Sequence, residues 1–328
     1  MPGNAFSFAR PEQPSPLTWG WGRWASVGCW KSDAQRTGGG NNRLVKIVTD
    51  STADIPEKLA AELGITIVPC NVHFGLETYR DGIELSKAEF YTRLKTSSTL
   101  PTTSAPAAGL FEATYRELAS ETDQILSIHL ASAFSAIYNS AYLGAEAVSD
   151  VEIALIDSGQ ASMGLGWLVI AAARAAQAGR SLAQIVALVE DMMPRVRLFA
   201  ALDTLEYLRK GGRVGKTVAV LGTLLDIKPL IEVRDSAVLP LERVRTRRRS
   251  IQRLIELAAE LGPLEELAVL HSNAPQKARR LAEEISFLHP LERIQIAEVG
   301  VIIGTHAGPN ALGVACVVAC CPYRNSGD

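Results

Sequence analysis

The sequence predicts an α/β protein built from two domains. Its 328 residues are about twice the ~150 residues of a common domain. Over most of the chain, short apolar stretches that fit strands alternate with longer stretches that fit helices. This alternation is typical of a mostly parallel sheet with helices on its faces. We place the first domain at residues 44–197 and the second at residues 198–324.

The expected elements of the first domain follow one another closely. Apolar runs predict strands at residues 44–48, 65–68, 72–74, 124–130 and 151–156. Helical stretches lie between them, at residues 56–63, 112–118 and 135–148, and two more follow the last strand, at residues 162–178 and 181–193. The helix at residues 162–178 is almost wholly apolar. We therefore expect a mostly parallel sheet in this domain.

The second domain begins after residues 194–198 and contains a pair of neighbouring strands. That pair is expected at residues 227–233 and 237–244, joined by a short polar turn. Further strands are expected at residues 267–271, 294–299 and 315–319, and helices at residues 218–226, 248–261 and 275–287. We expect a mixed sheet here.

Residues 1–43 differ from the rest of the chain. They hold four of the five tryptophans and show neither a helical nor a strand period. They also lack the continuous apolar segment of a signal peptide. We interpret them as a disordered extension. The alternative is a tail that binds a partner, because tryptophan side chains are costly to leave in water.

The composition argues against several classes of protein. Hydrophobic residues make up 47% of the chain and charged residues 21%, which excludes a wholly disordered protein. A net charge of -2 argues against a nucleic-acid partner. The longest apolar run, residues 163–173, is too short to span a bilayer, so no stable membrane insertion is expected. The five cysteines include no CxxC pair, and we interpret them as apolar filler in a reducing cytoplasm and not as redox or metal sites.

Four short segments carry hydroxyl residues or glycines where ligands bind in open α/β sheets, beside strand ends and helix starts. They are residues 49–52, 101–106, 130–136 and 304–309. In the first, Asp50 fits a helix cap or a metal ligand. In the second, Ser104 fits a helix cap, and the hydroxyl groups at the start of a helix also fit an anion site.

The third and fourth segments extend this pattern. Residues 130–136, with Ser135, offer a second positive helix end. In residues 304–309, glycines on both sides leave His306 accessible to a ligand; the alternative is an ordinary surface or capping histidine. The sequence has no GxGxxG, GxxxxGK[ST], HExxH or GxSxG motif, so nothing indicates a nucleotide cofactor or a complete catalytic set.

The densest basic run, residues 243–249, contains no aromatic residues. A binder of single-stranded nucleic acid interleaves aromatic with basic residues. We interpret the run as the solvated start of a helix, with a docking patch for an acidic partner as the alternative.

Taken together, the segments resemble the DegV family of bacterial fatty-acid-binding proteins, from about Val45 to Val318. The ordered motifs are Val48-Thr49-Asp50-Ser51-Thr52; Val68-Pro69 with Tyr79-Arg80-Asp81-Gly82; Thr103-Ser104; Ser132, Ser135, Tyr138 and Ser140-Ala141; Asp157-Ser158 with Gly164 and Gly166; Leu205 to Arg213; Arg245-Thr246-Arg247; and Gly304-Thr305-His306-Ala307-Gly308-Pro309.

The resemblance implies that one fatty acid lies between the two domains, with its chain in an apolar tunnel and no further cofactor. It implies that Thr103, Ser135 and His306 hold the carboxylate, with Ser104 and Thr305 as possible additional pocket residues. It further implies a non-enzymatic protein that presents the fatty acid to a separate ATP-dependent fatty acid kinase, which makes an acyl phosphate for phospholipid synthesis. Arg213, with Arg209 as the alternate, corresponds to the arginine of the kinase encounter.

An enzyme is the competing interpretation. The substrate-binding half of dihydroxyacetone kinases has a related fold and uses a histidine on a carbonyl group. The chain would then be a carbonyl-substrate kinase subunit, or a phosphatase, that uses Asp50 and His306.

Overall fold

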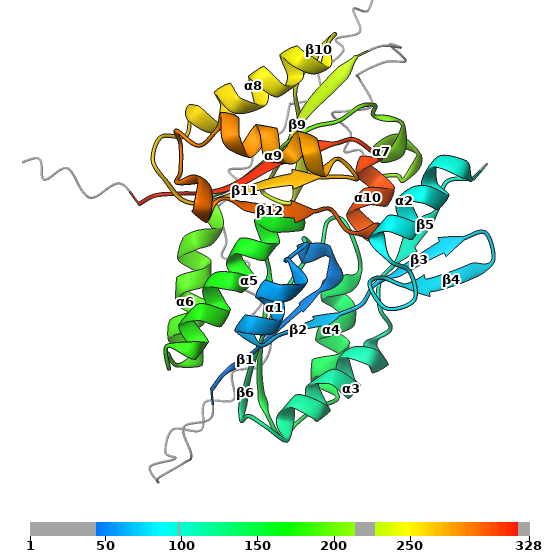
Figure 1. The fold of residues 1–328 in the computed structure, drawn as a ribbon. Helices are drawn as coiled ribbons and strands as arrows, with labels where there is room; N and C mark the ends of the chain where they lie inside the picture. The colour runs from blue at the N-terminus through cyan, green and yellow to red at the C-terminus, as the bar shows by residue number, and fades with distance from the viewer. Residues whose placement is uncertain (1–43, 98, 214–226, 321–328) are drawn as a thin grey trace, which may run out of the picture. The chain divides into compact units, whose positions relative to one another are not determined.

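The computed structural model describes residues 44–97, 99–213 and 227–320 (Figure 1). The extension predicted at residues 1–43 and the helix predicted at residues 218–226 lie outside the described residues. The described residues form two main sheets, a small third sheet and the helices that cover them.

The first main sheet has four parallel strands, as the alternation of strands and helices predicted. Their order is β2-β1-β6-β7, and all three pairings are parallel. The bounds are β1 Lys46–Asp50, β2 Ile65–Val68, β6 Gln124–His129 and β7 Glu152–Asp157. The accompanying helices are α1 Glu57–Leu63, α3 Ala108–Ala119, α4 Ile137–Glu146, α5 Ser162–Gln177 and α6 Leu182–Met192.

The second main sheet has six strands in the order β10-β9-β8-β13-β11-β12. The pair β11–β12 is parallel and the other pairings are antiparallel, so the expectation of a mixed sheet is confirmed. The strands are β8 Val196–Ala201, β9 Lys228–Arg234, β10 Ala237–Val244, β11 Leu264–His271, β12 Gln295–Glu298 and β13 Leu312–Val318. The helices are α7 Glu206–Lys210, α8 Arg247–Ala259, α9 Pro275–Glu284 and α10 Val301–Ala307.

Helix α5 packs against both main sheets, because it contacts β1 and β6 of the first and β8, β11 and β13 of the second. This explains why it is apolar on nearly every side, since neither face is left to water. Its Trp167 is fully buried, and the indole Nε1 donates a hydrogen bond to the Ala315 carbonyl at 2.9 Å.

The third sheet is a difference from the sequence prediction, which expected only one strand there. It has the order β4-β3-β5, with β3 Asn71–Phe74, β4 Glu77–Arg80 and β5 Thr102–Ser104, and α2 Lys87–Thr96 follows β4. Both β4 and β5 are short and largely exposed, so they lack the apolar alternation that marks a half-buried strand. In Figure 1 this sheet and α2, drawn in cyan, lie beside α10.

Two local predictions near this sheet are wrong. Ser104 belongs to β5 and does not cap α3, whose N-cap is Ala107 without a side-chain hydrogen bond. The glycine-flanked loop expected around His306 is mostly the helix α10, which ends at Gly308. Gly304 lies inside that helix, where a Cβ atom would stand 2.7 Å from the Tyr91 hydroxyl oxygen. Glycine is therefore present at 304 because a neighbouring side chain approaches closely.

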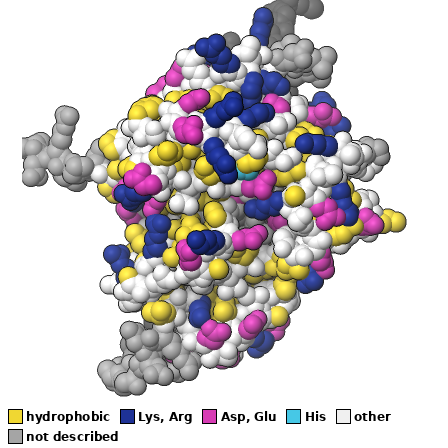
Figure 2. All heavy atoms as spheres, viewed as in Figure 1, with side chains coloured by type: hydrophobic (Ala, Val, Ile, Leu, Met, Phe, Trp, Pro, Cys, Tyr) yellow, Lys and Arg dark blue, Asp and Glu magenta, His cyan; other side chains and the backbone are white. Residues whose placement is uncertain are grey.

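The basic run at residues 243–249 leads into the start of α8. The Arg247 guanidinium is half-buried and donates to the carbonyls of Ala201 and Asn310. Arg249 and Arg253 pair with glutamates of the same region. Figure 2 shows lysine and arginine side chains over α8 and α9, with acidic side chains among them. The expectation of a solvated helix start fits most of the run.

Two further observations concern apolar segments and cysteines. None of the helices in the described ranges is long and apolar enough to cross a membrane. Cys70 and Cys316 are buried free thiols, as expected, whereas Cys320 is exposed.

Candidate functional site

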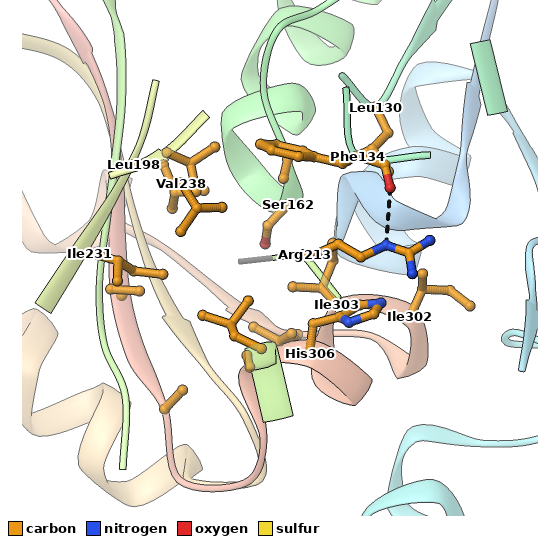
Figure 3. A pocket seen from close by; sticks show the side chains of 18 of the residues that line it. Leu130, Phe134, Ser162, Leu198, Arg213, Ile231, Val238, Ile302, Ile303 and His306 are labelled. Atoms are coloured by element: carbon orange, nitrogen blue, oxygen red, sulfur yellow. Dashed lines mark hydrogen bonds between the residues drawn. The ribbon is translucent and has the colours of Figure 1, made fainter. Parts of the chain in front are cut away.

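An apolar cavity lies between the carboxyl end of the first sheet and the face of the second. Its walls include Leu130 and Phe134 after β6, and Leu198, Ile231 and Val238 from β8, β9 and β10. The empty space, including its open mouth, is about 1020 Å³. Figure 3 shows Leu198, Ile231 and Val238 of the second sheet on one side of this space, with side chains from the loop after β6 and from α10 also lining it. The position beside the carboxyl ends of parallel strands is where open α/β sheets bind ligands.

Polar side chains from three separate segments also line this cavity. They are Thr103 of β5, Ser135 in the turn before α4, and His306 in the last turn of α10. The Thr103 Oγ1 and His306 Nε2 atoms are 3.3 Å apart. The structure thus brings together three residues that are distant in the sequence and that were singled out from it.

His306 has the environment of a neutral imidazole. Burial and, to a smaller degree, the positive charge of Arg213 lower its pKa to about 4. Its Nδ1 atom is buried and has no hydrogen-bond partner. At neutral pH the ring therefore carries no charge and can donate one hydrogen bond.

Four further residues were singled out from the sequence, Ser104 and Thr305 for the pocket and Arg213 and Arg209 for the kinase encounter, and only two of them line the cavity. Ser104 and Arg213 line the cavity, and the Arg213 Nε atom donates to the Phe134 carbonyl at 3.2 Å (Figure 3). Thr305 is buried within α10, where its hydroxyl donates to the Val301 carbonyl. Arg209 is exposed on α7. Neither Thr305 nor Arg209 is among the residues that line the cavity.

Asp50 lies in a different environment from His306. Its carboxylate is fully buried and accepts hydrogen bonds from Thr52 and from the Leu130 backbone, and it is 3.0 Å from His129 Nδ1. Burial alone would raise its pKa, but the hydrogen bonds and the His129 charge lower it overall. Asp50 caps the short 3-10 helix Ser51–Ala53, as the capping interpretation expected.

Asp50 therefore does not form a site with His306. It is absent from the cavity lining, and His129 continues the buried hydrogen-bond chain to Ser127, which is itself fully buried. Within the described ranges, no group of three or more histidine, cysteine or acidic side chains is arranged to hold a metal ion.

The sequence reasoning missed a second buried carboxylate, Asp54. Its Oδ2 accepts from the Ser162 hydroxyl at 2.5 Å, and its Oδ1 accepts from the Gly300 backbone at 2.7 Å. Burial raises the pKa of Asp54 to about 7. Ser162 lines the cavity at the start of α5. The rule that singled out the other strand ends would have found Ser162 if it had been applied to the end of β7.

Comparison with known proteins identifies the family of this chain. The profile described as "Uncharacterised protein, DegV family" matches residues 44–319. The chain belongs to the DegV family. A DegV domain-containing protein from Halalkalibacterium halodurans is 37% identical over 275 residues, which cover 83% of this chain and 97% of the relative.

Solved structures of DegV proteins share the fold. DegV from Bacillus subtilis, described as a fatty acid binding protein, matches with a TM-score of 0.76 and 34% identity over 84% of this chain and 99% of that one. A second match is a DegV family protein from Thermus thermophilus, described by its fatty acid binding. Its TM-score is 0.76 and its identity 30%, over 84% of this chain and 100% of that one. The two-domain α/β fold expected from the sequence is thereby confirmed.

Proposed function

We propose that this DegV protein binds a long-chain fatty acid in the cavity between its sheets. The observation that carries the proposal is an apolar cavity with a few polar donors gathered on its lining, in the fold of the fatty-acid-binding relatives. Each methylene group moved from water into such a cavity contributes about 0.8 kcal/mol. The acyl chain of the fatty acid therefore supplies most of the affinity, and the polar residues orient the ligand.

In this proposal the carboxylate lies among Thr103, Ser135 and His306. A carboxylate accepts several hydrogen bonds, and the two hydroxyl groups and the His306 Nε2 atom can donate them. Arg213 lines the same cavity, but its guanidinium donates to the carbonyls of Phe134 and Gly211 and is not assigned to the carboxylate. Because His306 is neutral in the free protein, it contributes a hydrogen bond and not a charge to the carboxylate.

The bound carboxylate would then be presented to a separate ATP-dependent fatty acid kinase. This part of the proposal rests on the family resemblance, together with the position of Arg213 on the cavity lining and of Arg209 on an exposed helix close by in sequence. A protein of this kind is a carrier for phospholipid synthesis and not itself the enzyme.

Native mass spectrometry of the freshly purified protein tests the binding proposal. We expect an adduct whose mass matches a long-chain fatty acid, and its release and identification after denaturation. A ligand-free mass that shifts only on addition of a nucleotide would contradict the proposal and favour an enzyme.

The kinase step is tested separately with the cognate kinase and radiolabelled ATP. Arg213→Ala and Arg209→Ala should retain the bound fatty acid while slowing the formation of acyl phosphate. Normal turnover with both variants would contradict the assignment of these arginines to the kinase encounter but would leave fatty acid binding standing.

A further inference from the structure

Helices α7 and α10 approach each other through two glycines, one at the end of each helix. A Cβ atom on Gly211, which ends α7, would stand 2.3 Å from the His306 Nδ1 atom and 2.8 Å from its Cε1 atom. A Cβ atom on Gly308, which ends α10, would stand 2.3 Å from the Tyr207 ring. Each glycine therefore admits an aromatic side chain of the opposite helix against the backbone.

The two glycines differ in why they are needed. Gly308 has a φ of 72°, in the left-handed region that favours glycine. Gly211 has a φ of −74° and a ψ of −5°, which any residue adopts. The contact with His306 is therefore what an added side chain at position 211 would disturb.

The surroundings of the Nδ1 atom indicate where His306 carries its proton. The Nδ1 atom is buried, has no hydrogen-bond partner and faces Gly211. A proton on that nitrogen would be a buried donor without an acceptor, which is unfavourable. The proton accordingly sits on Nε2, the atom that lies 3.3 Å from the Thr103 hydroxyl oxygen.

Residues 211–213 also reach the other side of the cavity. Arg213 donates through Nη1 to the Gly211 carbonyl at 2.9 Å and through Nε to the Phe134 carbonyl at 3.2 Å. Phe134 directly precedes Ser135. Residues 211–213 thus contact His306 and the turn that carries Ser135, although Gly211 itself does not line the cavity.

We propose that Gly211 is a positioning residue of the head-group site, which comprises Thr103, Ser135 and His306. Gly211 holds the His306 ring in place and keeps the ring's proton on Nε2, so that Nε2 donates to the ligand. The proposal rests on the proposed function, because it takes the ligand to be a carboxylate. An alanine at position 211 pushes the ring away and should weaken recognition of the head group without changing the apolar walls.

Competition binding against a fluorescent fatty acid tests the positioning role of Gly211. The two competing ligands are palmitic acid and hexadecanol, which have alkyl chains of the same length but carry a carboxylate and a hydroxyl head group, respectively. The wild-type protein should prefer the acid. In Gly211→Ala we expect that preference to fall by about tenfold while hexadecanol affinity stays the same. The control is Gly109→Ala on α3, where a Cβ atom would meet nothing within 4 Å, and it should keep the wild-type preference.

A double-mutant cycle separates positioning from a general structural effect. If Gly211 acts through the His306 ring, Gly211→Ala should have no further effect on the preference in a His306→Ala background. Nitrogen-15 NMR of the histidine rings should show the Nε2-protonated tautomer for His306 in the wild type and a loss of that state in Gly211→Ala. Additive losses in the cycle, or an unchanged tautomer and preference in Gly211→Ala, would overturn the proposal.

The outcomes also separate this proposal from the function it rests on. A wild-type protein that binds neither ligand, or that does not prefer the acid, contradicts the proposed function. A wild-type preference for the acid that survives in Gly211→Ala contradicts only the positioning role.

Discussion

At the residue scale, the two hydroxyl side chains assigned to the carboxylate are free of the capping role that competed with it. The N-cap of α3 is Ala107 and that of α4 is Ala136, and neither cap has a side-chain hydrogen bond. Thr103 lies in β5 and Ser135 directly precedes the α4 cap. Loss of either hydroxyl should therefore affect ligand binding more than folding.

Ser135→Ala tests this directly. We expect the affinity for a fluorescent fatty acid to fall by roughly ten- to hundredfold, because a hydrogen bond to a charged group is lost while the apolar walls are intact. The melting temperature of the ligand-free protein should stay the same. Ser132→Ala, in the same turn but outside the lining, is the matched control. A lower melting temperature with unchanged affinity would instead indicate a structural role for Ser135.

The charge state of His306 gives a second prediction. Its pKa of about 4 leaves the ring neutral in the free protein from about pH 6 to about pH 8, above the range in which it gains a proton. The loss of affinity in His306→Ala should therefore be constant over that interval. Fatty acid titrations at several pH values check it, and a loss that shrinks as the pH rises would show that the imidazolium is the donor.

At the element scale, close contacts at glycines determine how neighbouring helices pack. On α4, a Cβ atom at Gly144 would stand 2.7 Å from the Phe111 Cβ atom and 2.8 Å from the Ala108 carbonyl oxygen of α3. Phe111 is fully buried, so it has no free space into which to move. The spacing of α3 and α4 therefore depends on glycine at this position.

Gly144→Ala should lower the free energy of unfolding by about 1–3 kcal/mol, the usual cost of overpacking a core. Gly109→Ala, on the partner helix with nothing near its Cβ atom, should be neutral or stabilising by up to about 1 kcal/mol. Urea denaturation of the two variants measures the difference. Equal stabilities would contradict the packing argument.

At the scale of the whole fold, two buried carboxylates join the first half of the chain to α10. Asp54 accepts from the Gly300 backbone, and Asp81 is buried, with Ser51 and the Val301 backbone acting on its pKa. Burial raises the pKa of Asp54 to about 7 and that of Asp81 to about 6, although the charge of Lys87 lowers both. The first N–H groups of the helix that carries His306 are thus held by side chains from the other half.

These buried carboxylates should make the free energy of unfolding depend on pH. Since the folded pKa of Asp54 is raised above its ordinary value of 3.8, the folded state binds more protons than the unfolded state between about pH 4 and about pH 7. Its stabilising contribution is therefore present at low pH and is lost as the pH rises through this window. The loss is at most about 1.4 kcal/mol for each pH unit.

Asp54→Asn removes this titration and resembles the protonated side chain. We expect the variant to gain stability relative to the wild type as the pH rises from about 4 to about 7, and the difference to level off above that range. Denaturation at several pH values measures it. Asp150→Asn, at an exposed position, should leave the profile unchanged. A difference between Asp54→Asn and wild type that does not vary with pH would contradict the assignment.

Much of the fold follows from patterns within short stretches of sequence. The strands of the parallel sheet and the long helices were predicted because their apolar residues recur with a local period. In the small third sheet β3 was predicted, whereas β4 and β5 were missed because they are short, polar and exposed; α2 was also missed. The loop expected around His306 is mostly a helix, and Gly304 and Gly308 accommodate side chains of other elements, which a local pattern does not contain.

The sequence by itself determined the two α/β domains, the family motifs and the residue types that we propose for the head-group site. Only the tertiary structure decided which of those residues meet. Thr103 and His306 come together across two hundred residues of chain, whereas Asp50 pairs with His129 in the core and away from the cavity. The proton of His306 is assigned to Nε2 because Nδ1 faces a glycine on another helix and has no acceptor. Burial and hydrogen bonding depend on neighbours distant in the chain, so local sequence alone does not show which of these residues meet.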